Sequence, residues 1–252
     1  MASSKPTPSP DNTTDPDPRL DPGDDDQVAR VVQARHKLMG RFEEKLRASP
    51  ALTDTAPQGT GPINRHGMPA VPVGQIRTEK WPVLDLGRTP TVTPQTFTLV
   101  IDGAVKRPIT LDWEHLQALP HVDDTSDFHC VTTWSRLDLR WRGVRVSTVL
   151  ALAEPDDDAT HLMAHGSDGY TTNVALEEAL KDDVLLAHTV DGAPLGVEHG
   201  GPLRMITPQL YAWKGSKWIC RLELMTADKP GFWEERGYSM SAHPWRNDRY
   251  RR

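Results

Sequence analysis

The sequence predicts an α+β protein with mixed β-sheets and short helices, preceded by an N-terminal region of different composition. Two observations predict this class. From about residue 74 onward, short strand-like runs follow one another, separated by turn residues and by short helical stretches. The chain also has no strand–helix–strand alternation and no glycine-rich phosphate loop after a strand, which argues against a nucleotide-binding α/β fold.

The N-terminal region is predicted to have three parts. Residues 1–26 contain six prolines and few large apolar side chains, which predicts a disordered acidic tail. From residue 27 to 47 apolar residues recur at helical spacing, which predicts an amphipathic helix that docks on the body or on a partner. A Pro/Gly-rich connector without periodicity completes the segment 27–73, and the body is expected to occupy residues 74–252.

Within the body, turn and capping signals separate the strands. The run "TFTLVIDGAVKRPITL" is typical of a hairpin that turns at Asp102 and Gly103. Asp112 and Ser147 are the expected N-caps of two short helices. Further strands are expected in "THLMAH", "YTTNV", "VLLAHTV", "LRMITP" and "KWICRLELM".

Composition and charge limit the classes of function. Hydrophobic residues make up 37% and charged residues 25% of the 252 residues, and no apolar run is long enough to span a membrane. Residues 1–26 hold seven Asp against two basic residues and so carry −5 of the formal net charge of −6. The body is therefore nearly neutral, and we expect no nucleic-acid partner.

The location is expected to be cytoplasmic. The N-terminus "MASSKPTPSPDNTT" has neither a twin arginine nor an apolar signal core. The two cysteines, Cys130 and Cys220, are too few for a disulfide framework, which favours a reducing compartment.

The segment "SDFHCVTTWSR" around Cys130 is the first candidate site. Cys220 alternates with apolar residues of an expected strand and is interpreted as structural. The neighbours of Cys130 are polar and follow neither helical nor strand periodicity, which predicts a loop facing a site, where nearby positive charge would favour the thiolate.

Three functions are open for the Cys130 thiol. It would bind zinc together with nearby His and Asp residues, act as a nucleophile with a histidine base, or bind a soft metal whose other ligands arrive with a cofactor. The spacing matches no usual zinc pattern, and adjacent residues such as His129 and Cys130 point in opposite directions in extended backbone.

The third function requires a place for an anionic cofactor, and two segments offer one. In "EHGGPLRM", paired glycines permit close backbone approach and Arg204 provides a planar fork suited to phosphate. In "YAWKGSKW", Lys214 and Lys217 flank Gly215 and Ser216, which favours an anion-binding concavity. A glycine turn with ordinary surface lysines is the alternative, and the interleaved tryptophans favour the site.

Five segments together resemble the molybdopterin-binding domain of the sulfite oxidase family, in its bacterial sulfite-oxidase-like branch. They occur in the same order over residues 74–250: "DFHCVTTWSR", "GYTTN", "DVLLAHTVDGAPL", "EHGGPLRMITPQLYAWKGSKW" and "PGFWEERGYSM". The resemblance implies a sulfite-oxidase-type α+β fold, a molybdenum–molybdopterin cofactor, and an oxidoreductase that transfers an oxygen atom on a small substrate containing sulfur or nitrogen.

The resemblance also implies the residues of the site. Cys130 would be the metal ligand and, with Trp134 and Arg136, a catalytic residue, while His129 would line the same pocket and contact the cofactor. The other residues expected to contact the cofactor are Thr78, Glu79, Lys80, Gly166, Ser167, His199, Arg204, Gly215, Ser216 and Lys217.

The chain departs from the family pattern just after the cysteine. Sulfite oxidases continue with Ala-Gly-Asn-Arg-Arg, whereas this chain has "VTTWSR", so its set of sulfite-binding arginines is incomplete and the substrate stays open. No haem-binding segment is present, so a separate electron-transfer partner is expected. A non-catalytic cofactor- or partner-binding module on the same fold is the alternative, with the N-terminal helix as docking element.

Overall fold

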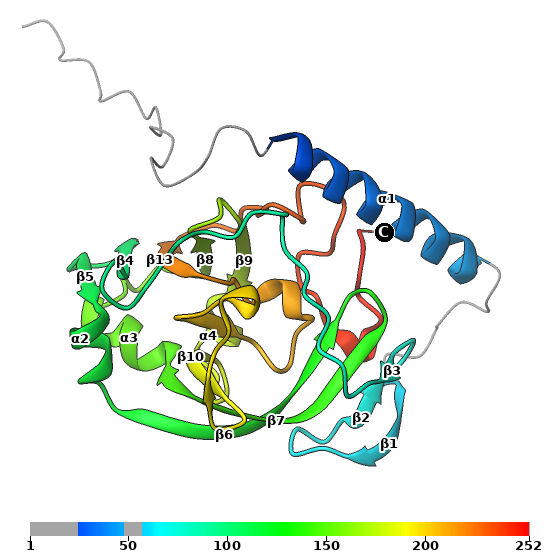
Figure 1. The fold of residues 1–252 in the computed structure, drawn as a ribbon, viewed down its shortest axis with the longest axis horizontal. Coiled ribbons are helices and arrows are strands. Elements are labelled where there is room, and N and C mark those ends of the chain that lie inside the picture. Colours follow the sequence, from blue (N-terminus) through cyan, green and yellow to red (C-terminus); the bar gives the residue numbers. More distant parts are fainter. Residues whose placement is uncertain (1–24, 48–56, 252) are drawn as a thin grey trace, which may run out of the picture.

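The computed structural model describes residues 25–47 and 57–251, so almost all of the predicted acidic tail lies outside the described residues. Two mixed sheets, a small hairpin and short helices form the body, and one long helix lies outside them (Figure 1). The predicted α+β class with mixed sheets is therefore confirmed. None of the described helices is both long and apolar enough to cross a membrane.

The five-stranded sheet has the order β5-β4-β13-β8-β9. Its strands are β4 (Thr98–Gly103), β5 (Ile109–Asp112), β8 (His161–Gly166), β9 (Thr171–Ala175) and β13 (Ile219–Met225). Strands β4 and β13 run parallel and the other pairs are antiparallel. The predicted hairpin β4–β5 is confirmed, and Gly103, with a φ of +83°, allows the chain to leave β4 against the backbone of Leu224.

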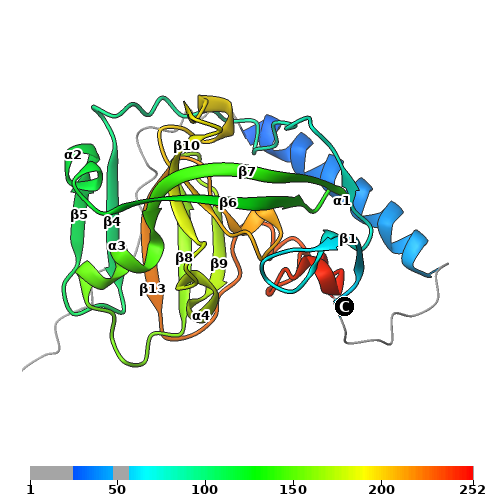
Figure 2. The same ribbon diagram turned by 90° about the horizontal axis from the view of Figure 1, so that it is seen from below.

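The six-stranded sheet is built around β7 (Trp134–Arg145), which pairs with three other strands. The remaining strands are β3 (Ile76–Arg77), β6 (His121–Cys130), β10 (Leu185–Val190), β11 (Ala193–Pro194) and β12 (Arg204–Ile206). The long hairpin β6–β7 runs along one side of the molecule (Figure 2). The segment around Cys130 is thus the end of this hairpin, and the predicted irregular polar loop is wrong.

Three short α-helices connect the strands: α2 (Trp113–Gln117), α3 (Val146–Ala153) and α4 (Leu176–Ala179). The Asp112 side chain caps α2 by accepting a hydrogen bond from the backbone N–H of His115, as predicted. Ser147 does not cap α3, because β7 continues directly into the helix and the cap position falls on Arg145, which makes no side-chain cap.

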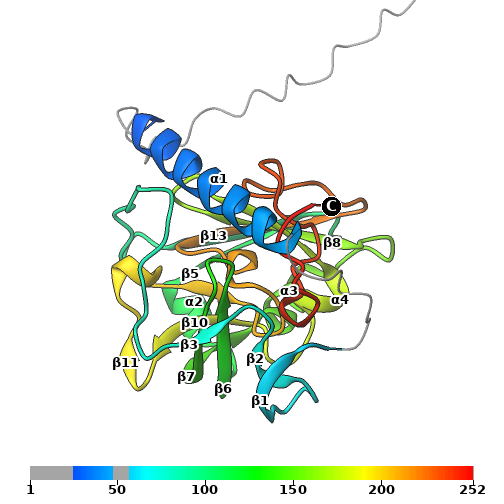
Figure 3. The same cartoon turned by 90° about the vertical axis from the view of Figure 1, so that its right-hand side faces the viewer.

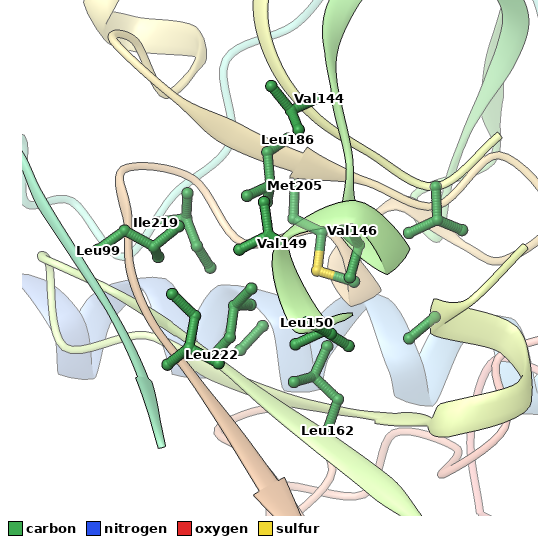
Figure 4. Packing of buried hydrophobic residues seen from close by; sticks show 14 of the residues in the cluster. Leu99, Val144, Val146, Val149, Leu150, Leu162, Leu186, Met205, Ile219 and Leu222 are labelled. Atoms are coloured by element: carbon green, nitrogen blue, oxygen red, sulfur yellow. The ribbon is translucent and has the colours of Figure 1, made fainter. Parts of the chain in front are cut away.

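The main hydrophobic core lies between the five-stranded sheet, α3 and the strands β10 and β12 (Figure 4). Leu150, Leu162 and Leu222 are fully buried there. A second group of buried residues, here called the aromatic cluster, comprises Leu86, Cys130, Val131, Tyr170, Tyr211, Trp213, Trp233, Tyr238 and Ala242.

Helix α1 (Asp25–Arg47) lies across the body over the aromatic cluster (Figure 3). Val28, Val31 and Val32 pack against that cluster, so the predicted amphipathic helix docks on the body. The described part of the connector forms a hairpin of β1 (Gly59–Ile63) and β2 (Pro69–Pro72), which its composition did not predict.

Candidate functional site

A cavity of about 110 Å³ lies between α1, the end of the β6–β7 hairpin and the loops that follow β3 and β11. The cavity brings together six of the predicted site residues, which are Cys130, Trp134, His199, Arg204, Gly215 and Lys217.

Cys130 is the last residue of β6 and faces this cavity. Its Sγ lies 3.1 Å from Thr132 Oγ1, and its carbonyl accepts a hydrogen bond from the Thr133 N–H. Burial raises the pKa of the Cys130 thiol, contrary to the predicted thiolate-favouring loop. The thiol is therefore neutral in the protein by itself, and a bound metal cation would be required to deprotonate it.

His129 points away from Cys130, as expected for neighbours on a strand. Its Nδ1 lies 2.8 Å from Ser135 Oγ, its ring packs edge-on against Trp245, and burial lowers its pKa to about 3. His129 does not line the cavity that Cys130 faces, so it is not placed to share a metal with the thiol or to act as its base. No group of three or more His, Cys, Asp or Glu side chains that could hold a metal occurs within residues 25–47 and 57–251.

Arg204 on β12 supplies a buried positive charge at the cavity. It is 3% exposed, and its Nη1 donates to the His199 carbonyl at 2.9 Å. Burial lowers the pKa of Arg204 to about 10, so the guanidinium stays charged at neutral pH. Its Nε has no hydrogen-bond partner, and none of the described acidic residues forms an ion pair with it. Such a charge is costly unless an anion binds it, and it therefore marks an anion site.

Lys217 lies beside Arg204 and extends the basic region of the cavity. Its Nζ donates to the Glu198 carbonyl at 2.6 Å and lies 3.3 Å from Asp85 Oδ2. Burial and the charge of Arg204 lower the pKa of Lys217 to about 8. Gly200, with a φ of +102°, leaves room for the Lys217 stem, because a Cβ there would lie 2.9 Å from Lys217 Cβ.

His199 and Trp81 form a flat wall of the same cavity. Their rings stack with centroids 3.8 Å apart and an interplanar angle of 7°. Burial and the neighbouring Arg204 lower the pKa of His199 to about 4, so its imidazole is neutral at physiological pH. His199 thus contributes a flat, uncharged aromatic surface to the cavity.

Three predicted residues before Trp81 lie outside the cavity lining. Thr78 donates its backbone N–H to the Ser135 carbonyl at 2.9 Å, while Glu79 and Lys80 are exposed. The residues that follow them, including Trp81 and Asp85, do line the cavity.

Four other predicted residues support the cavity without lining it. Gly166 and Ser167 form a buried turn, in which the Ser167 hydroxyl donates to the Trp218 carbonyl at 3.2 Å. Ser216 is fully buried and donates to the Lys217 carbonyl. Arg136 forms an ion pair with Asp191 at 2.9 Å, with its guanidinium over the Trp81 ring.

Lys214, unlike Lys217, is not part of the basic cavity. Its Nζ is fully buried and lies 2.7 Å from Glu234 Oε1 and 2.6 Å from Asn173 Oδ1. Glu234 Oε1 also accepts hydrogen bonds from Trp213 Nε1 and Thr172 Oγ1. The ion pair Lys214–Glu234 is therefore a structural link, and the interpretation that both lysines flank an anion site is wrong.

Sequence reasoning missed several residues of the cavity wall. Asp168 directly follows the predicted site residues Gly166 and Ser167, and burial raises its pKa to about 6. Tyr238 lies in the segment "PGFWEERGYSM", which carried the resemblance but was assigned no residue of the site. Arg35 comes from α1, where an arginine among regularly spaced apolar residues was the available signal.

Comparison with known proteins identifies the family to which this chain is related. A family model described as the oxidoreductase molybdopterin binding domain matches residues 86–233. The oxidoreductase YuiH of Bacillus subtilis (strain 168) is 40% identical over 181 residues, which is 71% of this chain and 91% of that protein. The protein-methionine-sulfoxide reductase catalytic subunit MsrP of Gluconobacter oxydans (strain 621H) is 30% identical over 177 residues, or 61% of this chain and 56% of that protein.

A solved structure shares the fold. The crystal structure of the sulfane dehydrogenase SoxCD from Paracoccus pantotrophus matches with a TM-score of 0.52 and 24% sequence identity, over 56% of this chain and 41% of that chain. The region matched by the family model contains Cys130, Arg204 and Lys217 but not helix α1.

Proposed function

The chain belongs to the family of oxidoreductases with a molybdopterin-binding domain, and we propose that it transfers an oxygen atom on a small substrate containing sulfur or nitrogen. One observation carries this proposal. The Cys130 thiol, the buried Arg204 and the half-buried Lys217 come from separate strands and loops, yet they line a single cavity. A soft-metal ligand and an anion site in one cavity are what a metal-bearing, phosphate-bearing cofactor requires.

The residues present fit such a cofactor. Cys130 would hold the metal, while Arg204, with its unpartnered Nε, and Lys217 would hold the phosphate. When bound, the cofactor supplies the oxygen-atom and electron transfer chemistry, and the protein supplies position and electrostatics. Trp81 and His199 form a flat side of the cavity, and Trp134 lines it together with Cys130.

The substrate and the electron partner are the finer parts of the proposal. A sulfur-containing substrate is supported by the name of one relative, a protein-methionine-sulfoxide reductase catalytic subunit. That name also supports a separate electron carrier, which we propose for this chain as well. A cytoplasmic location is proposed only on the sequence features given above.

Metal analysis of the purified protein tests the cofactor site. We expect about one molybdenum and one pterin per chain in the wild type, and loss of molybdenum in Cys130→Ser. The matched control is Cys220→Ser, because Cys220 lies on β13 and does not line the cavity. A wild-type protein that carries stoichiometric zinc in place of molybdenum would overturn the proposal.

The reaction is tested on the loaded protein with artificial electron carriers. We expect turnover either of a sulfoxide or an N-oxide with a reduced viologen, or of a reduced sulfur compound with ferricyanide. Loaded protein that turns over none of these compounds in either direction would contradict an oxygen-atom transferase and favour a binding module.

A further inference from the structure

The buried face of helix α1 carries one charged residue at its centre. Apolar residues recur along this face at helical spacing, and those in contact with the body are Val28, Val31, Val32, Met39 and Phe42. Arg35 lies in the middle of the same stripe, and its side chain lines the cavity that contains Cys130. An arginine at this position interrupts an apolar contact face, which needs a physical reason.

Arg35 has no carboxylate partner in the described part of the chain. The two acidic residues of the cavity wall are engaged elsewhere, Asp85 with Lys217 and Asp168 with the Tyr170 N–H. Arg35 and Arg204 therefore leave the cavity with two guanidinium groups that no described acid neutralises. The cavity thus has positive charge available for more than one negative group.

The two guanidinium groups serve different parts of the cavity. Arg204 lies with His199 and Lys217, which we assign to the cofactor phosphate. Arg35 belongs to the helix that packs on the aromatic cluster, and it lines the cavity together with Cys130 and Tyr238 of that cluster. Arg35 is thus on the side of the metal ligand.

The turn after Cys130 supplies no cation to the cavity, since Arg249, whose guanidinium donates to the Val131 carbonyl, does not line it. Its residues Val131, Thr132 and Thr133 are uncharged, and the next arginine, Arg136, is held by Asp191 at 2.9 Å and does not line the cavity. A positive charge beside the metal ligand must therefore come from another part of the chain, and Arg35 is placed to supply it.

We propose that Arg35 is a specificity-determining residue that binds an anionic group of the substrate beside Cys130, and that helix α1 is thereby a wall of the active site. This inference rests on the proposed function and adds to it the charge of the substrate. It also gives a role to a helix that lies outside the matched family region.

The test compares Arg35→Gln and Arg35→Lys with Arg30→Gln in loaded protein. Arg30 is exposed on the opposite side of the same helix, so Arg30→Gln removes the same charge without touching the cavity. The first readout is the dissociation constant of sulfate, an unreactive oxyanion, followed by fluorescence of the cavity tryptophans. The second is KM for sulfite against KM for the neutral dimethyl sulfoxide, and molybdenum content is measured for every variant.

In Arg35→Gln we expect about a 10- to 100-fold weaker sulfate affinity, which corresponds to the loss of one charge-assisted hydrogen bond. We expect KM for a turned-over anionic compound to rise similarly, KM for a neutral one to change little, and Arg35→Lys to restore most of the affinity. Arg30→Gln should match the wild type.

Two results would overturn the assignment of Arg35. One is sulfate affinity within about twofold of the wild type in a fully loaded Arg35→Gln protein, since a lost charge-assisted contact costs more than this. The other is loss of molybdenum in Arg35→Gln but not in Arg30→Gln, which would place Arg35 on the cofactor. Failure of the proposed function is distinguishable, because it would appear in the wild type itself, either as absence of molybdenum or as loaded protein without turnover, whereas sulfate affinity is compared among the variants.

Discussion

At the scale of single residues, the presence or absence of a partner for a buried charge distinguishes a structural residue from a ligand-binding one. Lys214 is paired with Glu234 and satisfied by further hydrogen bonds, so it needs no ligand. Arg204 is equally buried but has an unpartnered Nε and no acid beside it. An uncompensated charge destabilises the folded chain, and a bound anion is what removes that cost.

The substitution Arg204→Met should therefore separate stability from binding. We expect the cofactor-free variant to be at least as stable as the wild type in urea, because a buried cation without a partner is replaced by an apolar side chain. Molybdenum content should fall at least about tenfold, since a charge-assisted contact to phosphate is lost. Arg107→Met, at an exposed position, is the control, and an Arg204→Met protein with full molybdenum would contradict the assignment.

Asp168 gives a pH-dependent prediction. Burial raises its pKa to about 6 from the usual 3.8, so the cost of burying the carboxylate grows as the pH rises from 3.8 to 6 and is complete above the folded pKa. Asp168→Asn keeps the acceptor for the Tyr170 N–H and should stabilise cofactor-free protein by about 1–3 kcal/mol at pH 7.

That gain should shrink as the pH falls below 6 and should be roughly halved at pH 5, because the native carboxyl is then largely protonated. Urea unfolding of both proteins at pH 7 and pH 5 measures the difference. A gain that grows toward low pH would have the wrong sign for a raised pKa and would refute this account.

At the scale of elements, the sequence predicted those with a clear apolar face or a local cap. Helix α1, the hairpin β4–β5 and the cap of α2 follow such signals. The hairpin β6–β7 was missed because β6 is mostly polar, and its Asp123 and Asp124 pair with arginines at the surface. Leu139 and Trp141 alternate with Arg140 and Arg142, and this period of two was the overlooked signal for β7.

The residues of the site were predictable only in part, because local sequence does not determine which distant residues pack together. Cys130, Arg204 and Lys217 could be named from residue type and from the resemblance, and they do meet in the cavity. Trp81 and Tyr238 could not, because their place depends on long-range packing rather than on local sequence. The orientation of His129 follows from strand pairing, which was not anticipated around Cys130.

The turn of the β6–β7 hairpin carries a strained residue next to the metal ligand. Thr133 has a φ of 78°, which β-branched side chains rarely adopt. We expect Thr133→Gly to raise the free energy of unfolding by about 0.5–1 kcal/mol, because the steric penalty removed exceeds the entropy cost of glycine.

Thr132→Gly is the comparison for this turn, since Thr132 has no positive φ and contacts Cys130 Sγ. We expect it to lower stability, again measured in urea. Equal effects of the two glycine substitutions would mean that backbone strain at Thr133 is not the cause.

At the scale of the whole molecule, α1 connects the N-terminal region with the matched family domain. It covers the aromatic cluster, pairs Asp25 with Arg88, and packs Phe42 edge-on against Tyr250 at 5.7 Å. The helix therefore stabilises the body as well as walling the cavity. The domain boundary expected at residue 74 remains a prediction. Helix α1, which precedes this boundary, packs on a cluster of side chains that belongs to the body.

A chain that starts at residue 57 tests this double role. We expect its melting temperature to fall by about 5–10 °C, because the apolar contacts of α1 are lost. Acrylamide should quench its tryptophan fluorescence more strongly, since Trp213 and Trp233 lose their cover. An unchanged melting temperature with unchanged quenching would mean that α1 does not hold to the body in solution.

The ion pair Lys214–Glu234 also bears on how the protein can evolve. Both side chains have no exposed surface, so changing either alone strands a charge in a dry interior. Substitutions at the two positions should consequently occur together. An alignment of related sequences should show lysine with glutamate, or two neutral residues, and few sequences with only one charged residue of the pair.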